Sequence, residues 1–404
     1  MGTALTAALA LAGSAFAASG LYLMGLSIAA LFYREDQRGF VPRSRLVVLV
    51  PAHDEELLIA RCVQSLRAQS YPAELFRVVV VADNCTDATA RCARAAGASE
   101  VLIRECPDSR GKGPALGWAL DQLTVGEQSP DAFVIVDADS VADRDLLLSL
   151  VRALDRGASA VQGEYLLYED GPGGELGTAA FILVNRVRPA GRAVLRIPQS
   201  HLSGNGMLFA TDLLRRVPWT AFSSAEDLEY ALTLRSANIA VAFAGAAKLR
   251  SPTAPTAAAA AQQQLRWHGG QAHLARTWVT RLTAAAVRER RPSLLLTAFE
   301  LAIPPLSLMV GAGVAGACTS SVLAFVGILP TWLPVVWLVG LVSLPVYVVV
   351  GLQAAGAPIS LYGAFRHAPR HVLNTIARAG QFARFRGDTW VRTDRQARSS
   401  DDLP

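Results

Sequence analysis

Two carboxylates directly after a strand pattern are the most informative feature of this sequence. Asp137 and Asp139 flank Ala138 and follow the apolar, β-branched run Phe133–Val136. A buried strand that ends in two acids would deliver oxygen ligands to its carboxyl end, and Mg²⁺ or Mn²⁺ binds such ligands. The alternative interpretation is a turn in which Asp139 or Asp143 caps a helix over Leu146–Leu154.

Two other predicted strands also lead into acids. The strand Leu46–Val50 continues into P-A-H-D-E-E at residues 51–56, and the strand Val78–Val81 into A-D-N-C-T-D at residues 82–87. Three acidic strand ends at one rim would repel one another unless a cation or hydrogen-bond donors compensate them. Asp54 and Asp87 could instead be helix N-caps.

A basic, glycine-containing segment supplies complementary charge. R-G-K-G at residues 110–113 precedes a helix predicted over Ala115–Leu123. A helix N-terminus with two cations suits a diphosphate. The spacing of a Walker A loop is absent, so the segment is not a P-loop.

Three clusters in the second half could contribute to the same site. S-G-N-G at residues 203–206 permits close backbone approach to a ligand, or is an ordinary turn. Glu226 and Asp227 open a helix over Leu228–Leu234, where an acid is either a general base or a complement to the helix dipole. Q-Q-L-R-W at residues 263–267 fits a phosphate and sugar contact, or a membrane-interface Trp with a neighbouring Arg.

Strand and helix patterns alternate between residues 46 and 136. A helix predicted from Glu55 to Ser70 follows the first strand, a helix over Ala88–Ala96 the second, and a further strand spans Val101–Ile103. Such repeated βα units predict an α/β fold with a mixed, mostly parallel sheet and helices on both faces. Ligands of these sheets gather at the carboxyl ends of the strands, where the acids lie.

Two apolar blocks predict a membrane protein. The 404-residue chain is 52% hydrophobic, and no charged residue occurs from Thr3 to Tyr33. The second block runs from Ser293 to about Leu361 and contains one charged residue, Glu300. About 20 apolar residues cross a bilayer, which predicts one span in the first block and two in the second, roughly Leu294–Leu329 and Trp332–Gln353. Pro304-Pro305 indicates a kinked helix, or an interfacial stretch followed by a span.

Basic residues predict the orientation of these spans. They cluster after the first block, before the second and after the last span, whereas the loop at Pro330 carries no charge. By the positive-inside rule these basic segments are cytoplasmic and the N-terminus is outside, which three spans satisfy. Ala15-Phe16-Ala17 offers a cleaved signal peptide as the alternative for the first block.

Other compositional features exclude some function classes. The basic residues beside the predicted spans account for the net charge of +5, and we find no nucleic-acid-binding motif. The five cysteines lack zinc-site spacing, so we expect reduced thiols. Apolar residues recur at helical spacing from Ile359 to Phe385 between Arg and His residues, which predicts a basic amphipathic helix at the headgroup plane.

The motifs in their order resemble one family. V-P-A-H-D-E-E, V-A-D-N-C-T-D, R-G-K-G, D-A-D, G-N-G-M, A-E-D and Q-Q-Q-L-R-W occur in sequence between residues 46 and 270. Each is weak alone, but the ordered set resembles the membrane-bound family 2 glycosyltransferases, which include cellulose and hyaluronan synthases. The resemblance implies a GT-A-like domain, a divalent metal cofactor (Mg²⁺ or Mn²⁺) and a nucleotide-diphosphate sugar donor, by default a UDP-sugar.

The resemblance also implies roles for residues at the donor site. Ala52, Glu55 and Asp83 would hold the nucleoside, and Lys112 would contact the diphosphate. Asp137 would lie against the nucleotide and share the metal with Asp139, the more direct ligand.

The remaining roles concern the acceptor side of the site. Asp227 would be the catalytic base, with Glu226 beside it. Gln263, Arg266 and Trp267 would close over the diphosphate and acceptor. At residues 53–54, His-Asp stands where the family usually has an aromatic residue and Asn, so the nucleotide base is less determined than the reaction.

The predicted organisation is therefore a membrane-bound transferase at the inner or plasma membrane. The expected segments are an anchor at 1–33, a cytoplasmic catalytic domain at 40–290, a membrane hairpin at 293–357, an interface helix and tail at 358–395, and a disordered end at 396–404. The acceptor would be a lipid or a growing glycan, and polysaccharide-export or assembly proteins are possible partners. The alternative is a catalytically silent membrane scaffold that binds nucleotide-sugar.

Overall fold

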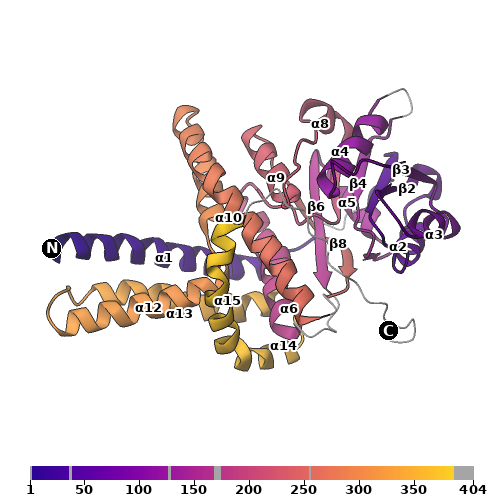
Figure 1. Cartoon of the computed structure of the whole chain (residues 1–404). Coiled ribbons are helices and arrows are strands. Elements are labelled where there is room, and N and C mark those ends of the chain that lie inside the picture. The colour runs from indigo at the N-terminus through magenta and orange to yellow at the C-terminus, as the bar shows by residue number, and fades with distance from the viewer. Residues whose placement is uncertain (1, 36–38, 126–128, 168–173, 254–255, 386–404) are drawn as a thin grey trace.

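The computed structural model describes residues 2–35, 39–125, 129–167, 174–253 and 256–385 (Figure 1). An α/β domain lies at one side and a group of apolar helices at the other, with α10, α14 and α15 between them (Figure 1). The expected tail beyond residue 385, with its disordered end at 396–404, falls outside the described residues.

Alternating strands and helices build the first half of the α/β domain. Its elements are β1 Leu46–Ala52, α2 Ile59–Arg67, β2 Phe76–Asp83, α3 Thr89–Ala95, β3 Glu100–Arg104, α4 Lys112–Leu123 and β4 Ala132–Ile135. These seven elements match the predicted βα units. Strands β3, β2, β1 and β4 are neighbours in that order and pair in parallel.

The second half of the domain makes the sheet mixed. The full strand order is β3-β2-β1-β4-β7-β6-β8-β5. The added elements are β5 Val141–Ala142, α5 Leu146–Asp155, β6 Ala160–Leu167, β7 Met207–Ala210, α8 Thr211–Arg216, α9 Glu226–Ser236 and β8 Ala242–Ser251. Strand β7 is antiparallel to both β4 and β6, while β6 and β8 are parallel. The sheet therefore has a parallel part, β3-β2-β1-β4, and a mixed part in which β7 is antiparallel to β4 and β6, and β5 is antiparallel to β8.

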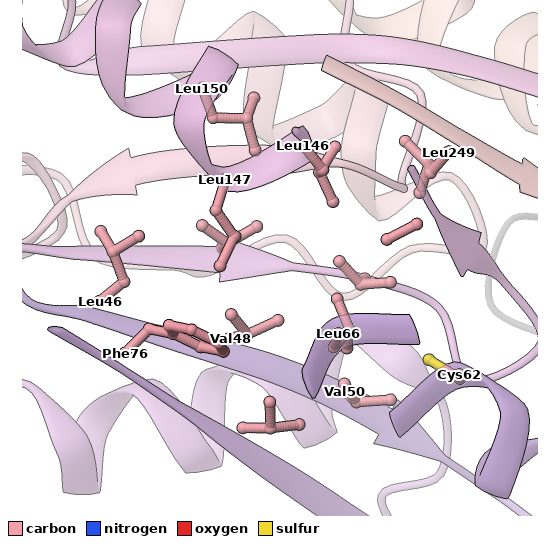
Figure 2. Packing of buried hydrophobic residues seen from close by; sticks show 14 of the residues in the cluster. Leu46, Val48, Val50, Cys62, Leu66, Phe76, Leu146, Leu147, Leu150 and Leu249 are labelled. Carbon is pink, nitrogen blue, oxygen red and sulfur yellow. The ribbon is translucent and has the colours of Figure 1, made fainter. Parts of the chain in front are cut away.

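The alternation of side chains along β1 divides the core into two layers. Leu46, Val48 and Val50 face α2 and α5, where they pack with Cys62 and Leu66 (Figure 2). Val47 and Leu49 point to the opposite side and pack in the cluster that includes Leu116 of α4 and Tyr230 of α9. Successive side chains of a strand point to opposite faces, so an apolar strand is buried on both sides. The carboxyl end of β1 is thereby fixed between two packed layers.

Three helices are long and apolar enough to cross a membrane: α1 Gly2–Ala30, α12 Leu306–Phe325 and α13 Leu333–Ala354. A shorter apolar helix, α11 Ser293–Ala302, precedes α12. The break between them falls at Pro304-Pro305, because proline lacks an amide hydrogen and restricts the residue before it. The structure thus has a short apolar helix followed by a long candidate span, and the interfacial position of the short helix stays a prediction.

Further helices connect the spans to the sheet. They are α6 Gly174–Ile182, the π-helical turn η2 Leu183–Val187, α7 Arg188–Leu195, α10 Ala257–Arg288, α14 Ser360–Gly363 and α15 Ala368–Arg384. Helix α7 contacts α1, and α15 contacts both α10 and α12. The C-terminal segment is helical over most of the predicted range, and its position in the headgroup plane stays a prediction.

Small residues allow α1 and α13 to approach closely. A Cβ atom added to Gly20 would meet the Ser343 hydroxyl and would lie 2.8 Å from the carbonyl oxygen of Gly340. Small residues at such contacts let membrane helices associate by close backbone packing. The close approach of α1 and α13, side by side in Figure 1, depends on these small residues, and the rings of Phe16 and Trp337 stack beside it at 5.4 Å.

We predict that Gly20→Ala weakens this helix pair, whereas Gly25→Ala on the same helix does not, because a Cβ at Gly25 meets nothing within 4 Å. Overpacking typically costs about 1–3 kcal/mol. The midpoint of thermal unfolding in detergent measures the effect. Equal midpoints for the two variants would contradict the close packing of α1 against α13.

Candidate functional site

A pocket lies where β1 and β2 end and α4 begins. It is lined by Pro51, Ala52, His53, Asp83, Arg110, Gly111, Lys112 and Ala115. The family resemblance implied nucleotide contacts for three of these residues, Ala52, Asp83 and Lys112, and all three line this pocket. Gly111 is the N-cap of α4, with φ +115°, and the helix N-terminus carries partial positive charge. This wall of the pocket is suited to an anion.

Asp83 forms an ion pair with Arg104, a residue for which no sequence motif predicted a role. Arg104, in β3, forms a 2.5 Å ion pair with Asp83, and both side chains are only 6% exposed. Arg104 also donates to the carbonyl oxygen of Ser109 at 2.8 Å. His53 Nδ1 lies 2.7 Å from the Asp83 carbonyl oxygen. Since β2 and β3 pair at this register, Arg104 fixes the rotamer of Asp83 at the pocket wall.

Lys112 connects the pocket to both acidic motifs. Its ammonium donates to the carboxylate of Asp137 and to the carbonyl oxygen of Gly204, and it lies 3.8 Å from Glu226 Oε1. Burial lowers the pKa of Lys112, but the neighbouring carboxylates of Asp137 and Glu226 outweigh it, so the net shift is upward. Lys112 is therefore a fixed positive charge between the D-A-D and A-E-D motifs.

A buried polar network supports the D-A-D segment. Asn205 Oδ1 accepts from the Asp137 amide at 3.0 Å, and Asn205 Nδ2 donates to Ser140 at 2.7 Å and to Ser251 at 3.3 Å. Ser140 also donates to Asp139 at 3.1 Å. Asn205 is fully buried, and a buried amide left without partners is costly. The G-N-G segment therefore positions the two aspartates. From the sequence, the segment was either a close approach to a ligand or an ordinary turn.

Neither acid of the D-A-D motif caps the following helix. Asp145 is the N-cap residue of α5 and makes no side-chain cap hydrogen bond. The capping alternative for Asp139 and Asp143 is therefore wrong. Two carboxylates on one turn, both partly accessible, match the oxygen donors that Mg²⁺ and Mn²⁺ prefer.

Two other rim acids have structural partners. Asp54 accepts from the Thr86 amide at 2.6 Å, and Asp87 accepts from the Thr89 amide at 2.9 Å. With Cys85, their potential ligand atoms lie within 4.8 Å of one another. Asp87 also accepts from the Glu56 amide at 3.1 Å, so both acids tie the loop after β1 to the loop after β2. The N-cap residues of α2 and α3 are Leu58 and Ala88, so the N-cap interpretation of Asp54 and Asp87 is wrong.

Glu55 does not begin a helix. Its amide donates to the Thr89 hydroxyl at 2.7 Å, Asp54 has φ +52°, and α2 starts at Ile59. The predicted helix start at Glu55 was therefore four residues early, because this cross-loop contact holds a turn. Glu55 lies beside the pocket but not among its lining residues.

The acidic pair at the start of α9 is half-buried, with Glu226 3.8 Å from Lys112. Burial raises the pKa of Glu226 to about 7 against the opposing attraction of Lys112, and burial also raises the pKa of Asp227. Gly204 has φ +77°, and a Cβ there would lie 3.2 Å from Asp227 Oδ2 and 3.5 Å from Lys112 Nζ. A glycine without a side chain thus lets the loop backbone reach both charged groups.

The Q-x-x-R-W residues lie on α10, outside the pocket lining. The Trp267 ring is 5.9 Å from the Phe181 ring, which is 4.9 Å from the Tyr165 ring in β6. Within the described part of the chain, Gln263 and Arg266 make no hydrogen bond or ion pair with the acidic motifs. A row of three aromatic rings therefore links the pentad to β6, and the pentad's contact with a ligand stays a prediction.

Comparison with known proteins shows the family to which the α/β domain belongs. The family model described as "Glycosyltransferase like family 2" matches residues 42–270. The β-monoglucosyldiacylglycerol synthase of a Synechocystis species is 27% identical over 57% of this chain and 48% of that protein. The same-named enzyme of a Nostoc species is 31% identical over 34% of this chain and 29% of that protein. The match spans at most about half the length of these curated relatives.

One solved structure shares the fold over most of the chain. It is the mannosyltransferase PcManGT from Pyrobaculum calidifontis, in complex with GDP-Man and Mn²⁺. The two structures align with a TM-score of 0.55 and 20% sequence identity, covering 85% of this chain and 98% of the other. At this level of identity the likeness establishes the architecture, including the mixed sheet.

We predict that Glu226→Gln changes how stability depends on pH. A carboxyl whose pKa is raised by folding contributes stability that is present below its unfolded value, about 4.3, and is lost as pH rises through the folded value. For Glu226 that folded value is about 7. Glutamine is neutral throughout, so the gain in unfolding midpoint over wild type should grow between these values. The measurement uses protein free of metal and donor.

Exposed Glu74 provides the matched control for this substitution. Glu74→Gln should leave the pH profile of the unfolding midpoint unchanged. A Glu226→Gln profile parallel to that of wild type would contradict the raised-pKa state of Glu226.

Proposed function

Because this chain belongs to glycosyltransferase family 2, we propose that it transfers a sugar from a nucleotide-diphosphate sugar to an acceptor hydroxyl at the membrane, with inversion at the anomeric carbon. The observation that carries the proposal is the position of Lys112. It lines the pocket of Ala52 and Asp83, contacts Asp137 and Gly204, and lies 3.8 Å from Glu226, the neighbour of Asp227 in the chain. The proposed donor pocket and the proposed base, Asp227, therefore lie on two sides of the Lys112 ammonium.

The donor binds with its nucleoside toward Ala52 and Asp83. The ring of His53 lines the same pocket where the family usually has an aromatic residue, and it is available to stack on the base. Lys112 and the N-terminus of α4 face the diphosphate and stabilise its negative charge. The default donor is a UDP-sugar, with GDP- and TDP-sugars as the alternatives to be tested.

Asp227 acts as the base for the acceptor. Its carboxylate lies beside Gly204 and Lys112, so an acceptor hydroxyl held there loses its proton to Asp227 as its oxygen attacks the anomeric carbon. Lys112 stabilises the charge that develops on the departing diphosphate. Asp139 and Asp137 would hold Mg²⁺ or Mn²⁺, which when bound supplies Lewis-acid assistance to the leaving group.

The enzyme works from the cytoplasmic side of the inner or plasma membrane. Three candidate spans and the flanking arginines support a multi-pass arrangement with a cytoplasmic catalytic domain. Of the two outcomes, we favour addition of one sugar to a lipid over secretion of a polymer. The curated relatives named above are glycolipid synthases, in keeping with a lipid acceptor.

We predict that Asp227→Asn retains donor binding while transfer falls by at least about two orders of magnitude. A positioned base typically contributes about 10²- to 10⁴-fold, and the amide cannot accept the proton. Sugar transfer and donor affinity are measured on the same preparation, with Asp212→Asn on exposed α8 as the control. Near-normal turnover of Asp227→Asn would remove Asp227 from this role.

The experiment that tests the function is nucleoside-diphosphate release by the full chain in vesicles, across a panel of nucleotide-sugars, with Mg²⁺, Mn²⁺ or EDTA. We expect release from one donor class, abolished by EDTA and strongly reduced in Asp139→Asn, because the carboxamide loses the charge that a hard cation requires. Donor binding without turnover, in the presence of a lipid extract, would favour the silent scaffold instead.

A further inference from the structure

Buried charged side chains lie where the membrane helices meet the catalytic domain. Arg192 of α7 forms a 2.6 Å ion pair with Glu300 of α11, the one charge within the second apolar block. Arg188 of the same helix donates to the Tyr347 hydroxyl of α13 at 3.0 Å. His201 Nε2 lies 3.3 Å from Asn185 Oδ1 in the π-helical turn η2. We call Arg188, Arg192, His201 and Glu300 the interhelix cluster.

The interhelix cluster has an excess of positive charge. It contains two arginines and one glutamate, and burial together with the charges of Arg188 and Arg192 lowers the pKa of His201 to about 4. The two arginines thus create a positive potential at His201. Within the described residues, no carboxylate pairs with Arg188, and the buried Nε of Arg192 has no acceptor. An anion is the group that this cluster lacks.

The cluster is at the membrane end of the catalytic domain. Helix α7 touches α1, and a Cβ at Gly191 would run into the backbone of Leu26, four residues before α1 ends. Tyr347, the partner of Arg188, lies seven residues before the end of α13. An ionisable side chain within an apolar segment, such as Glu300, marks a functional site by default. The cluster lies beside helices that are long and apolar enough to meet lipid. A π-helical turn at its edge is also a frequent feature of functional sites.

A short chain segment joins the cluster to the catalytic residues. His201 is three residues before Gly204, whose carbonyl accepts from Lys112 and whose Cα approaches Asp227. Three residues span at most about 10–11 Å. His201 is thus on the same short loop segment as Gly204, which borders Asp227.

We propose that Arg188 and His201, supported by Arg192, bind the phosphate of an anionic membrane lipid and present that lipid to Asp227 as the acceptor. This inference rests on the proposed function and names its acceptor class. The acceptor oxygen forms the new bond to the anomeric carbon as the bond from that carbon to the diphosphate oxygen breaks. A hydroxyl acceptor gives its proton to Asp227, whereas a terminal phosphate oxygen attacks as the anion; the products are the glycosylated lipid and the nucleoside diphosphate.

The test compares three acceptors in phosphatidylcholine vesicles that contain the full chain and its donor. Phosphatidylglycerol carries a phosphate within a headgroup that has hydroxyls, an isoprenyl monophosphate carries a terminal phosphate, and diacylglycerol carries a hydroxyl without phosphate. We expect transfer to one or both phosphate-bearing lipids and little to diacylglycerol. Product analysis shows whether a headgroup hydroxyl or the terminal phosphate receives the sugar.

Variants at Arg188 identify the subsite. Arg188→Gln should raise the KM for the phosphate-bearing lipid about 10- to 100-fold, the loss expected for one charge-assisted hydrogen bond, while leaving the donor affinity unchanged. Arg188→Lys, which keeps the charge, should recover part of the loss. Arg196→Gln, an exposed arginine at the end of the same helix, should stay within about twofold of wild type.

Unfolding midpoints of all variants are measured alongside, and donor binding reports folding of the site. Efficient transfer to diacylglycerol, with Arg188→Gln affecting all lipids alike, would overturn the phosphate subsite and leave the proposed transferase standing. Absence of nucleoside-diphosphate release with every donor and every lipid would overturn the transferase proposal and this inference together.

Discussion

The contact of one lysine with three segments is the interaction on which the candidate site depends. Lys112 begins α4, yet its ammonium reaches the end of β4 at Asp137, the loop at Gly204 and the start of α9 at Glu226. A buried ammonium requires negative charge around it. The two acidic motifs in turn require a cation, because buried carboxylates near one another repel. The lysine and the two acidic motifs therefore offset one another's desolvation cost.

The loop at residues 199–206 transmits this arrangement toward the membrane. At one end, Gln199 forms a bridge with Val241, and Ser200 donates to Glu300 at 3.4 Å. At the other end, Asn205 holds the amide of Asp137. Because β7 follows immediately and runs antiparallel to β4, the loop is fixed at the same rim as the D-A-D motif. The apolar helix α11 and the acidic D-A-D motif are therefore connected by one short segment.

Patterns that act locally predicted much of this molecule. Short apolar, β-branched runs predicted β1, β2 and β4, and long continuous apolar blocks predicted the three membrane-spanning candidates. The acids at the ends of β1, β2 and β4 were expected at one rim, since parallel strands end on the same edge of a sheet. The structure places Ala52, Asp83 and Lys112 around one pocket, with Lys112 in contact with Asp137.

Contacts between distant residues decided the rest. No sequence motif indicated a role for Arg104, because only the register of β3 against β2 brings it to Asp83. Asn205 looked like a turn residue, because its partners Ser140 and Ser251 are far from it along the chain. The turn that delays α2 to Ile59 depends on a hydrogen bond to Thr89. The sequence by itself determined which segments are apolar, which are acidic and where strands end, since these follow from side-chain type and period. Which polar groups share a buried space was decided by tertiary packing, because burial forces each of them to find a partner.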